Sequence, residues 1–182
     1  MRIISGKYKG RILKAPKGIR PTEDRVRKAL FDILGDVSDL AFLELFAGSG
    51  AVGLEALSAG AAQAVFCEKD RQAIKAIQEN LKALKAQEEA EILPGDVIDA
   101  IEHMARSSRK FDIVFLDPPY YGQSAEKTLQ TLGDYDILQT SGYIIVQHFK
   151  KDSLPAKQGN LALVRQEKYG DSLLSFYRHH EL

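Results

Sequence analysis

The hydrophobic positions of the chain fall into short runs, each of which predicts a strand or a helix. Five runs predict strands, at residues 41–46, 64–68, 90–93, 111–116 and 143–147. Three segments between them carry apolar side chains at helical spacing, at residues 52–59, 70–84 and 97–106. The continuous apolar runs 111–116 and 143–147 are typical of parallel strands that are buried on both faces. Strands that alternate with helices predict a parallel sheet with its ligand at the carboxyl ends of the strands.

The two ends of the chain have a different pattern. Residues 2–5 and 11–14 flank a Gly-bounded loop and predict a β-hairpin, and Thr22 is placed to cap an amphipathic helix after it. Residues 161–168 and 172–178 predict a closing antiparallel hairpin. The predicted fold class is therefore α/β, with a seven-stranded, mostly parallel sheet and a terminal antiparallel hairpin, preceded by a small N-terminal β-hairpin and helix. The predicted domains are 1–36, the basic N-terminal part, and 37–182, the α/β domain.

Length and composition exclude several classes of protein. With 182 residues, 45% apolar and 27% charged, the chain has the composition of an ordinary globular domain with one core. Cys67 is the only cysteine, so no internal disulfide forms, and no cysteine and histidine spacing indicates a metal site. No apolar run is long enough to span a bilayer, and the first residues lack the pattern of a signal peptide. We expect a cytoplasmic protein.

Charge is distributed unevenly along the chain, although the formal net charge is zero. Ten of the 25 basic residues and two of the 25 acidic residues lie in residues 1–30, so this segment carries +8 and the remainder carries −8. A basic segment on an acidic body indicates a nucleic-acid contact confined to one end. A lysine-rich solvated hairpin explains the charge equally well.

The first candidate motif is a glycine-rich loop that follows the strand 41–46. Gly48, Gly50 and Gly53 form the pattern G-x-G-x-x-G, and Glu68 lies 20 residues after Gly48. Glycines let the backbone approach a nucleotide-like cofactor, and an acid at the end of the second strand accepts hydrogen bonds from ribose hydroxyls. NAD and S-adenosylmethionine fit this pattern equally well, and a tight turn without a ligand also gives it.

Two further acids bear on the cofactor. Glu44 precedes the loop, and a carboxylate there favours the cationic S-adenosylmethionine over the pyrophosphate of NAD. Asp96, after the third predicted strand, is placed to accept from an adenine amino group or to cap the helix that follows.

The second candidate motif is Asp117-Pro118-Pro119-Tyr120, at the end of the strand 111–116. Two prolines stiffen the backbone and leave its carbonyls free to accept hydrogen bonds. A carboxylate and a free carbonyl can accept both N–H groups of an exocyclic amine on a base, and Tyr120 can stack on the base. The motif therefore predicts methyl transfer to an amine. A Pro-Pro turn that ends a buried strand is the structural alternative.

These motifs resemble class I, Rossmann-like S-adenosylmethionine-dependent methyltransferases. The chain as a whole is similar to the bacterial family that makes N2-methylguanosine in 16S ribosomal RNA. The resemblance is carried by residues 2–11, 20–22 with 25–27, 46–50, 115–120, and 169–171 with 174–178. Two positions depart from the pattern: Glu44 stands where Asp is expected, and Gln147 stands before His148 where the family often has Glu, so neither Gln147 nor His148 is assigned a role.

The resemblance implies S-adenosylmethionine as the cofactor and ribosomal RNA, or an assembling small ribosomal subunit, as the partner. We expect a monomer that uses no metal and contacts no membrane. The implied catalytic residues are Asp117, Pro118, Pro119 and Tyr120. The expected cofactor-binding residues are Glu44, Phe46, Ala47, Gly48, Gly50, Glu68, Lys69, Asp96, Val97 and, within the segment 20–27 that would cover the cofactor, Thr22. The expected RNA-binding residues are Arg2, Lys7, Lys9, Arg11, Lys14, Arg20 and Arg25.

Rival functions share parts of the pattern. An adenine-N6 methyltransferase shares Asp117-Pro118-Pro119-Tyr120, but no unassigned stretch is long enough for a target-recognition insert. An NAD-dependent oxidoreductase shares the glycine loop and Glu68 but lacks an obvious hydride-transfer partner, and an RNA-binding module without catalysis would show damage in one motif. The sequence does not determine which nucleotide is modified, whether the substrate is naked RNA or a particle, or the oligomeric state.

Overall fold

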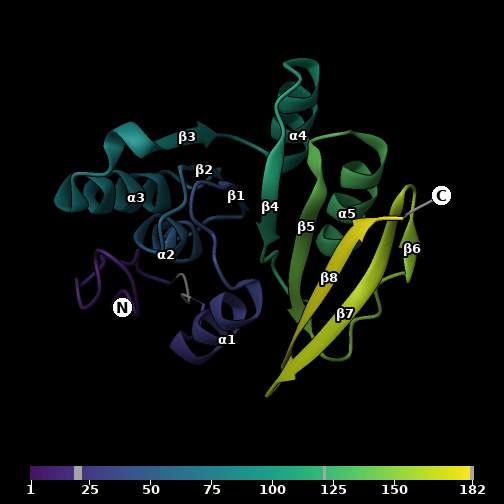
Figure 1. Cartoon of the computed structure of the whole chain (residues 1–182), viewed down its shortest axis with the longest axis horizontal. Helices are drawn as coiled ribbons and strands as arrows, with labels where there is room; N and C mark the ends of the chain where they lie inside the picture. The colour runs from purple at the N-terminus through teal and green to yellow at the C-terminus, as the bar shows by residue number, and fades with distance from the viewer. Residues whose placement is uncertain (19–21, 121, 181–182) are drawn as a thin grey trace. The chain divides into compact units, whose positions relative to one another are not determined.

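The computed structural model describes residues 1–18, 22–120 and 122–180. The chain divides into two compact units, Met1–Asp96 and Val97–Leu182, which run from purple to teal and from teal to yellow in Figure 1. This division after Asp96 differs from the domain boundary after residue 36 that the sequence predicts, and that boundary stays a prediction. None of the helices in the described part of the chain has the length and apolar character that crossing a membrane requires.

The first unit contains three parallel strands in the order β3-β2-β1. The strands are β1 (Ala41–Leu45), β2 (Gln63–Glu68) and β3 (Ala90–Pro94). Its helices are α1 (Asp24–Leu34), α2 (Ala51–Ser58), α3 (Arg71–Leu84) and the short 3-10 helix η1 (Gln87–Glu89). Helix α2 packs on β1 and β2, and α3 packs on β2 and β3. These contacts confirm the βαβ arrangement predicted for residues 41–93.

Helix α2 lies in the middle of this unit. All of its residues are buried, including Glu55 and Ser58. Gly53 allows this close packing, because a Cβ atom at this position would lie 2.4 Å from Cε1 of Phe66 on β2. A side chain at Gly53 would therefore push the helix away from the strand.

The basic N-terminal segment is docked on α2 and α3 and forms a short hairpin. Its two arms pair through an antiparallel bridge between Arg2 and Ile12 and through backbone hydrogen bonds of 2.8–3.0 Å that join residues 1–3 to residues 10–13. The buried carboxylate of Glu55 accepts hydrogen bonds from the backbone N–H groups of Ile4 and Ser5 at 2.9–3.1 Å. Side chains on α2 and α3 therefore replace the strand partner that a longer hairpin would have supplied.

Two further contacts fix the same segment. The buried amide of Asn80 exchanges two hydrogen bonds with the backbone of Lys14, at 2.8 and 2.9 Å. Ser58 accepts from the N–H groups of Lys7 and Tyr8, at 2.8 and 2.9 Å. The chain approaches so closely here that a Cβ atom at Gly6 would lie 1.9 Å from the Ser58 carbonyl oxygen.

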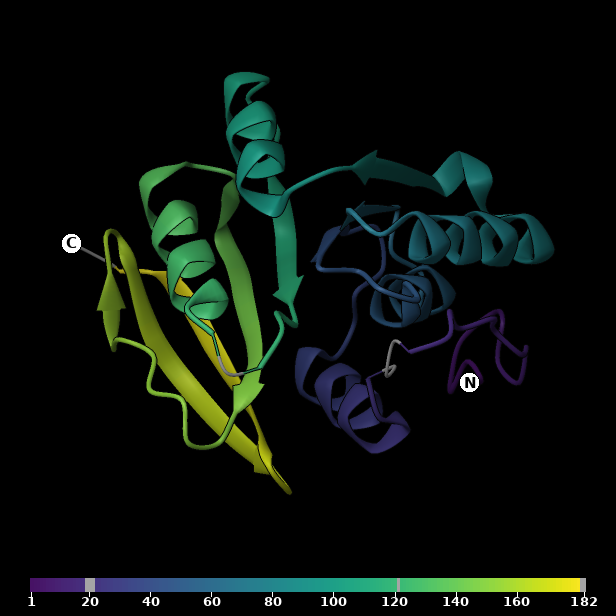
Figure 2. The ribbon, with the colours of Figure 1, turned by 180° about the vertical axis from the view of Figure 1, so that it is seen from behind.

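The second unit has five strands in the order β4-β5-β8-β7-β6. They are β4 (Phe111–Leu116), β5 (Leu138–Phe149), β6 (Lys157–Gln158), β7 (Leu161–Tyr169) and β8 (Ser172–His179). β4 and β5 are parallel, whereas β8, β7 and β6 add antiparallel pairs. Helices α4 (Val97–Arg106) and α5 (Ser124–Asp134) lie together on one face of β4 and β5, as Figure 2 shows.

Three sequence predictions differ from the structure. The structure has eight strands within the described residues, because the two-residue β6 was not expected. Thr22 does not cap α1; the N-cap residue is Glu23, and its side chain makes no capping hydrogen bond. The strand expected at 143–147 extends over Leu138–Phe149. The closing hairpin is confirmed by β7 and β8.

Two glycines of the N-terminal segment test its docking. Gly6 and Gly10 both have positive φ, at +76° and +83°, but a Cβ atom at Gly10 meets nothing within 4 Å. Alanine at either position carries the left-handed cost of about 1–2 kcal/mol. We expect Gly6→Ala to lose a further 1–3 kcal/mol, approximately, because it also separates the N–H groups of Ile4 and Ser5 from Glu55. Urea unfolding of both variants measures the difference, and equal losses would contradict the docking.

Candidate active site

The glycine-rich loop between β1 and α2 has a strained backbone. Phe46 has φ 57°, a left-handed value that is uncommon for a bulky residue, and Gly48 and Gly50 follow with φ 56° and 74°. The N–H of Gly50 donates to the Ala47 carbonyl at 2.8 Å, and the N–H of Ala47 donates to the Cys67 carbonyl at 3.0 Å. This tight loop gathers four predicted cofactor-binding residues, and strain of this kind concentrates at ligand sites.

Glu68 links the end of β2 to this loop. Its Oε2 accepts from the N–H of Gly48 at 2.7 Å, and its Oε1 accepts from the N–H groups of Lys69 and Asp70 at 2.8 and 2.9 Å. A carboxylate has about four acceptor positions, so roughly one is left for a hydroxyl donor of a ligand. The structure thus brings Glu68 and Gly48 together as the spacing predicted. Lys69 contributes its backbone here, and its side chain is exposed.

Glu44 also binds backbone, which the sequence interpretation did not foresee. Its side chain is 3% exposed, and its Oε2 accepts from the N–H of Gly53 in the first turn of α2 at 2.7 Å. A negative charge at the N-terminus of a helix is stabilising. Glu44 therefore holds α2 against β1, whatever further role it has toward a cationic ligand.

Asp96 follows β3 beside Glu68. The N–H of Gly95 donates to the Glu68 carbonyl at 2.9 Å, and Gly95 has φ 138°. Burial, with the nearby carboxylates of Glu68 and Asp96, raises the pKa of the Cys67 thiol to about 12. Cys67 is thus an inert core residue, and two acids lie close together at the carboxyl ends of β2 and β3. Val97 begins α4 in the second unit and is 6% exposed.

The N-terminal segment reaches the glycine loop. The hydroxyl of Ser49 donates to the Met1 sulfur at 3.8 Å. Arg27 on α1 is fully buried, and its Nη2 donates to the Arg2 carbonyl at 2.9 Å and to Asp24 at 2.6 Å. Nε and Nη1 of Arg27 have no partner among the described residues. Thr22 is partly buried just before α1, and Arg20 lies outside the described residues.

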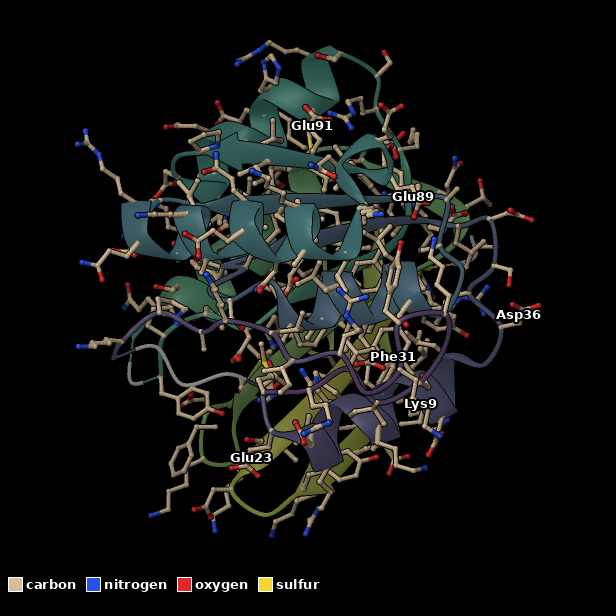
Figure 3. All side chains as sticks on the ribbon, turned by 90° about the vertical axis from the view of Figure 1, so that its left-hand side faces the viewer. Lys9, Glu23, Phe31, Asp36, Glu89 and Glu91 are labelled. Carbon is tan, nitrogen blue, oxygen red and sulfur yellow. The ribbon has the colours of Figure 1, made fainter. Side chains whose placement is uncertain are left out.

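Most of the basic side chains expected to bind RNA have partners within the first unit. Lys7 Nζ lies 2.7 Å from Glu89, and Lys14 Nζ lies 2.9 Å from Glu79. Arg11 and Arg2 donate to the carbonyls of Ala83 and Gly10, at 2.7 and 3.1 Å. The exposed Lys9, labelled with Glu89 in Figure 3, and the exposed Arg25 have no ion-pair partner in the part of the chain that the structure describes. The segment therefore presents less free positive charge than its composition indicates.

In the second unit, Asp117 follows β4 directly. Asp117 is partly buried and Pro118 is buried, whereas Pro119 and Tyr120 are exposed. Burial raises the pKa of the Asp117 carboxyl from 3.8 to about 7. A carboxyl that titrates near neutral pH is typical of a functional site.

Tyr120 is held by the ends of β5 and β8. Its hydroxyl lies 2.9 Å from the Ser172 hydroxyl, and its ring centroid lies 6.1 Å from that of Phe149 at a tilt of 37°. Phe149 and Ser172 are opposite each other in the ladder. Sequence reasoning missed both supports, because a cross-strand pair becomes visible only when the register is known.

A buried polar network runs along the same two strands. His148 Nε2 lies 2.7 Å from the Ser175 hydroxyl, which also accepts from Gln166 at 2.8 Å. Burial lowers the pKa of His148 and favours its neutral form. Gln147 and His148 thus lie in the interior at β5, and no group of three or more His, Cys, Asp and Glu side chains in the described residues is placed to hold a metal ion.

Solved structures share this fold over almost the whole chain. The Escherichia coli protein yhhF has a TM-score of 0.83 at 34% identity and covers 100% of this chain and 99% of its own. An RNA methyltransferase from Salinibacter ruber, solved with S-adenosyl-L-homocysteine, has a TM-score of 0.68 at 18% identity and covers 90% and 96%. The fold is that of the Rossmann-like class I methyltransferases, for which S-adenosylmethionine is the cofactor.

Sequence comparison is more specific. The model of the family described as Conserved hypothetical protein 95 matches residues 1–178, and the chain belongs to this family. The curated ribosomal RNA small subunit methyltransferase D of Escherichia coli strain K12 is 38% identical over 181 residues, which are 98% of this chain and 89% of that protein. The resemblance seen in the sequence motifs is thereby confirmed.

Gly48 tests the predicted cofactor loop. Valine has a strongly unfavourable conformation at φ 56° and places a side chain where a cofactor approaches the backbone. We expect Gly48→Val to lower the affinity for S-adenosylhomocysteine at least roughly tenfold, as measured by calorimetry. Gly170→Val is the matched control, because Gly170 has φ +59° and nothing within 4 Å of a Cβ atom. An unchanged affinity in a folded Gly48→Val protein would contradict the placement.

Asp117 gives the stability a predictable dependence on pH. Between its ordinary pKa of 3.8 and its folded value of about 7, the folded protein binds the proton more tightly than the unfolded chain does. The contribution of Asp117 to stability is therefore full below the lower value and is lost as pH rises through the higher one. Relative to Asp117→Asn, the wild type should lose roughly 1–3 kcal/mol between about pH 5 and about pH 8 in urea unfolding. Parallel pH profiles would show that Asp117 titrates normally.

Proposed function

We propose that the protein transfers a methyl group from S-adenosylmethionine to the exocyclic N2 amine of a guanine in small-subunit ribosomal RNA. The nature of the RNA is supported by the 38% identity to ribosomal RNA small subunit methyltransferase D over 98% of the chain. Methylation of an amine is supported by the residues Asp117 to Tyr120 and their surroundings in the second unit.

The observation that carries the proposal is the raised pKa of Asp117 beside a buried, rigid Pro118. With a pKa of about 7, the carboxyl is partly ionised near neutral pH and accepts an N–H of the amine in its ionised form. The carbonyl of Pro118 accepts the second N–H. Two acceptors on one side of the amine turn its lone pair toward the methyl donor.

When bound, S-adenosylmethionine would supply the methyl group from its sulfonium centre, where the S–CH₃ bond breaks as the N–C bond forms and S-adenosylhomocysteine is the leaving group. The amine nitrogen then carries the positive charge, and its proton becomes strongly acidic. Asp117 receives this proton and passes it to water. The positive charge on nitrogen strengthens its hydrogen bond to the Asp117 carboxylate, so this interaction favours the transition state over the ground state.

Tyr120 binds the base through its exposed ring. Stacking of a base on an aromatic side chain contributes about 1–3 kcal/mol and does not depend on the identity of the base. The ring is already oriented by Ser172 and Phe149, so little freedom is lost when the base arrives. The guanine must be unstacked or lie in a loop to reach Tyr120.

In the first unit, the proposed cofactor contacts are the backbone of residues 46–50, Glu68 for the ribose and Asp96 for the adenine amino group. The remaining acceptor position of Glu68 supports the ribose assignment. Thr22 and Lys69 stay proposed contacts of the same group, and Val97, the first residue of the second unit, stays a prediction from the sequence. For RNA binding, Lys9 and Arg25 are exposed without an ion-pair partner among the described residues. Lys7, Arg11 and Lys14 would first have to give up their present partners in the first unit.

An assay of methyl incorporation tests the function. The wild type should transfer labelled methyl groups to small-subunit ribosomal RNA, offered naked and as an assembled particle, with the label mapped to N2 of a guanine. Asp117→Ala should lose about 100-fold or more in turnover while S-adenosylhomocysteine affinity stays near wild type. Tyr120→Phe should be mild and Tyr120→Ala severe, since only the second removes the ring.

Two outcomes would refute the proposal. Label mapped to N6 of adenine would establish the rival amine methyltransferase. Equal turnover of wild type and Asp117→Ala would show that residues 117–120 are only a turn.

A further inference from the structure

Three lysines gather where β5 ends and β7 turns into β8, at the end of the second unit to which β4 and β5 also point (Figure 1). Lys150 and Lys151 follow Phe149, and Lys168 lies near the end of β7. The ammonium of Lys150 lies 2.6 Å from Asp171, and together with Lys168 and Lys151 it holds the pKa of that carboxyl below its usual value. Lys150, Lys151 and Lys168 are called the lysine tip below.

The lysine tip carries more positive charge than its own acids neutralise. Lys151 and Lys168 are exposed and have no ion-pair partner within residues 122–180. Of the neighbouring acids, Glu167 accepts from Arg165 at 2.7 Å, and Asp152 lies within electrostatic range of the buried His148. Asp171 is the acid that forms an ion pair with Lys150 and lies within electrostatic range of Lys151 and Lys168.

The lysine tip directly follows Phe149 and Ser172, the two residues that hold Tyr120, along the β5–β8 ladder. The last cross-strand pair of β5 and β8, Phe149 with Ser172, contacts the ring and the hydroxyl of Tyr120. The next pair outward is joined by the N–H of Lys150, which donates to the Asp171 carbonyl at 2.8 Å. The residues that hold Tyr120 and the first lysine of the tip, Lys150, thus occupy successive positions along the β5 and β8 strands.

We propose that the lysine tip binds the phosphates of the RNA nucleotides next to the base that stacks on Tyr120. This inference rests on the proposed function, because that function places the base on Tyr120. An aromatic ring beside positive charge that follows the backbone is the arrangement by which proteins hold single-stranded nucleic acid. The net charge of the sequence does not indicate this basic cluster, because the residues beyond 30 are acidic as a whole.

The test compares two double variants of equal charge. Lys151→Gln/Lys168→Gln removes the free charges of the tip, and Lys127→Gln/Lys157→Gln removes two exposed lysines from α5 and β6. Binding of a fluorescein-labelled stem-loop RNA with guanines in its loop is followed by anisotropy across a KCl series. The tip variant should bind more weakly. Its salt slope, the magnitude of the slope of the log association constant against the log KCl concentration, should fall by about 1.4, or about 0.7 for each lost phosphate contact. The control should keep the wild-type slope, and equal slopes for the two variants would overturn the proposal.

A third variant predicts a change of opposite sign. Asp171→Asn removes the carboxylate that opposes the phosphates and frees Lys150, so the salt slope should steepen by about 0.7. An unchanged or shallower slope would count against the tip. Calorimetry with S-adenosylhomocysteine checks that each variant is folded.

Failure of this inference and failure of the proposed function give different results. RNA binding with a tip-dependent slope but no methyl transfer to guanine would overturn the proposed function and leave the tip as an RNA-binding surface. Guanine methylation together with an unchanged salt slope in the tip variant would overturn only the proposal that the lysine tip binds phosphates. Failure of the wild type to bind the RNA would overturn the tip proposal directly.

Discussion

Three glutamate carboxylates satisfy backbone N–H groups that the regular elements of the first unit leave unpaired. Glu44 binds the first turn of α2, Glu55 binds the N-terminal segment, and Glu68 binds the glycine loop and the start of α3. A buried N–H without a partner costs about 1–3 kcal/mol, so the irregular segments depend on these acids for their conformation. The same contacts hold the glycine loop to the end of β2 and the basic segment to α2.

In the second unit, the site is positioned by a long antiparallel ladder of β5 and β8 next to the parallel pair β4 and β5. β5 extends beyond β4 and pairs with β8, so its last residue, Phe149, lies beside Tyr120. The polar pair of His148 and Ser175 is buried in this ladder and fixes its register. Register in turn decides that Ser172 meets Tyr120.

Charge must be judged by its partners as well as by its amount. The N-terminal segment is strongly basic, yet Lys7 and Lys14 are neutralised by acids on η1 and α3. Residues beyond 30 are acidic in total, yet Lys151 and Lys168 have no ion-pair partner among the described residues of the second unit. Exposed ion pairs are weak, at about 0–1 kcal/mol, so an RNA phosphate can replace the acid partner of a lysine at small cost.

The sequence by itself determined the βα alternation and the closing hairpin, because these follow from local periodicity. It also predicted the glycine loop with Glu68 and the four residues from Asp117 as the site, because these stand in short motifs at the ends of predicted strands. Tertiary structure alone decided that Glu44 and Glu55 bind backbone and that the N-terminal hairpin is short and docked on α2 and α3. It also decided the pKa of Asp117 and the support of Tyr120 by Ser172 and Phe149. Each of these depends on residues about 10 to 50 or more positions apart, and burial and register set such contacts where no local pattern records them.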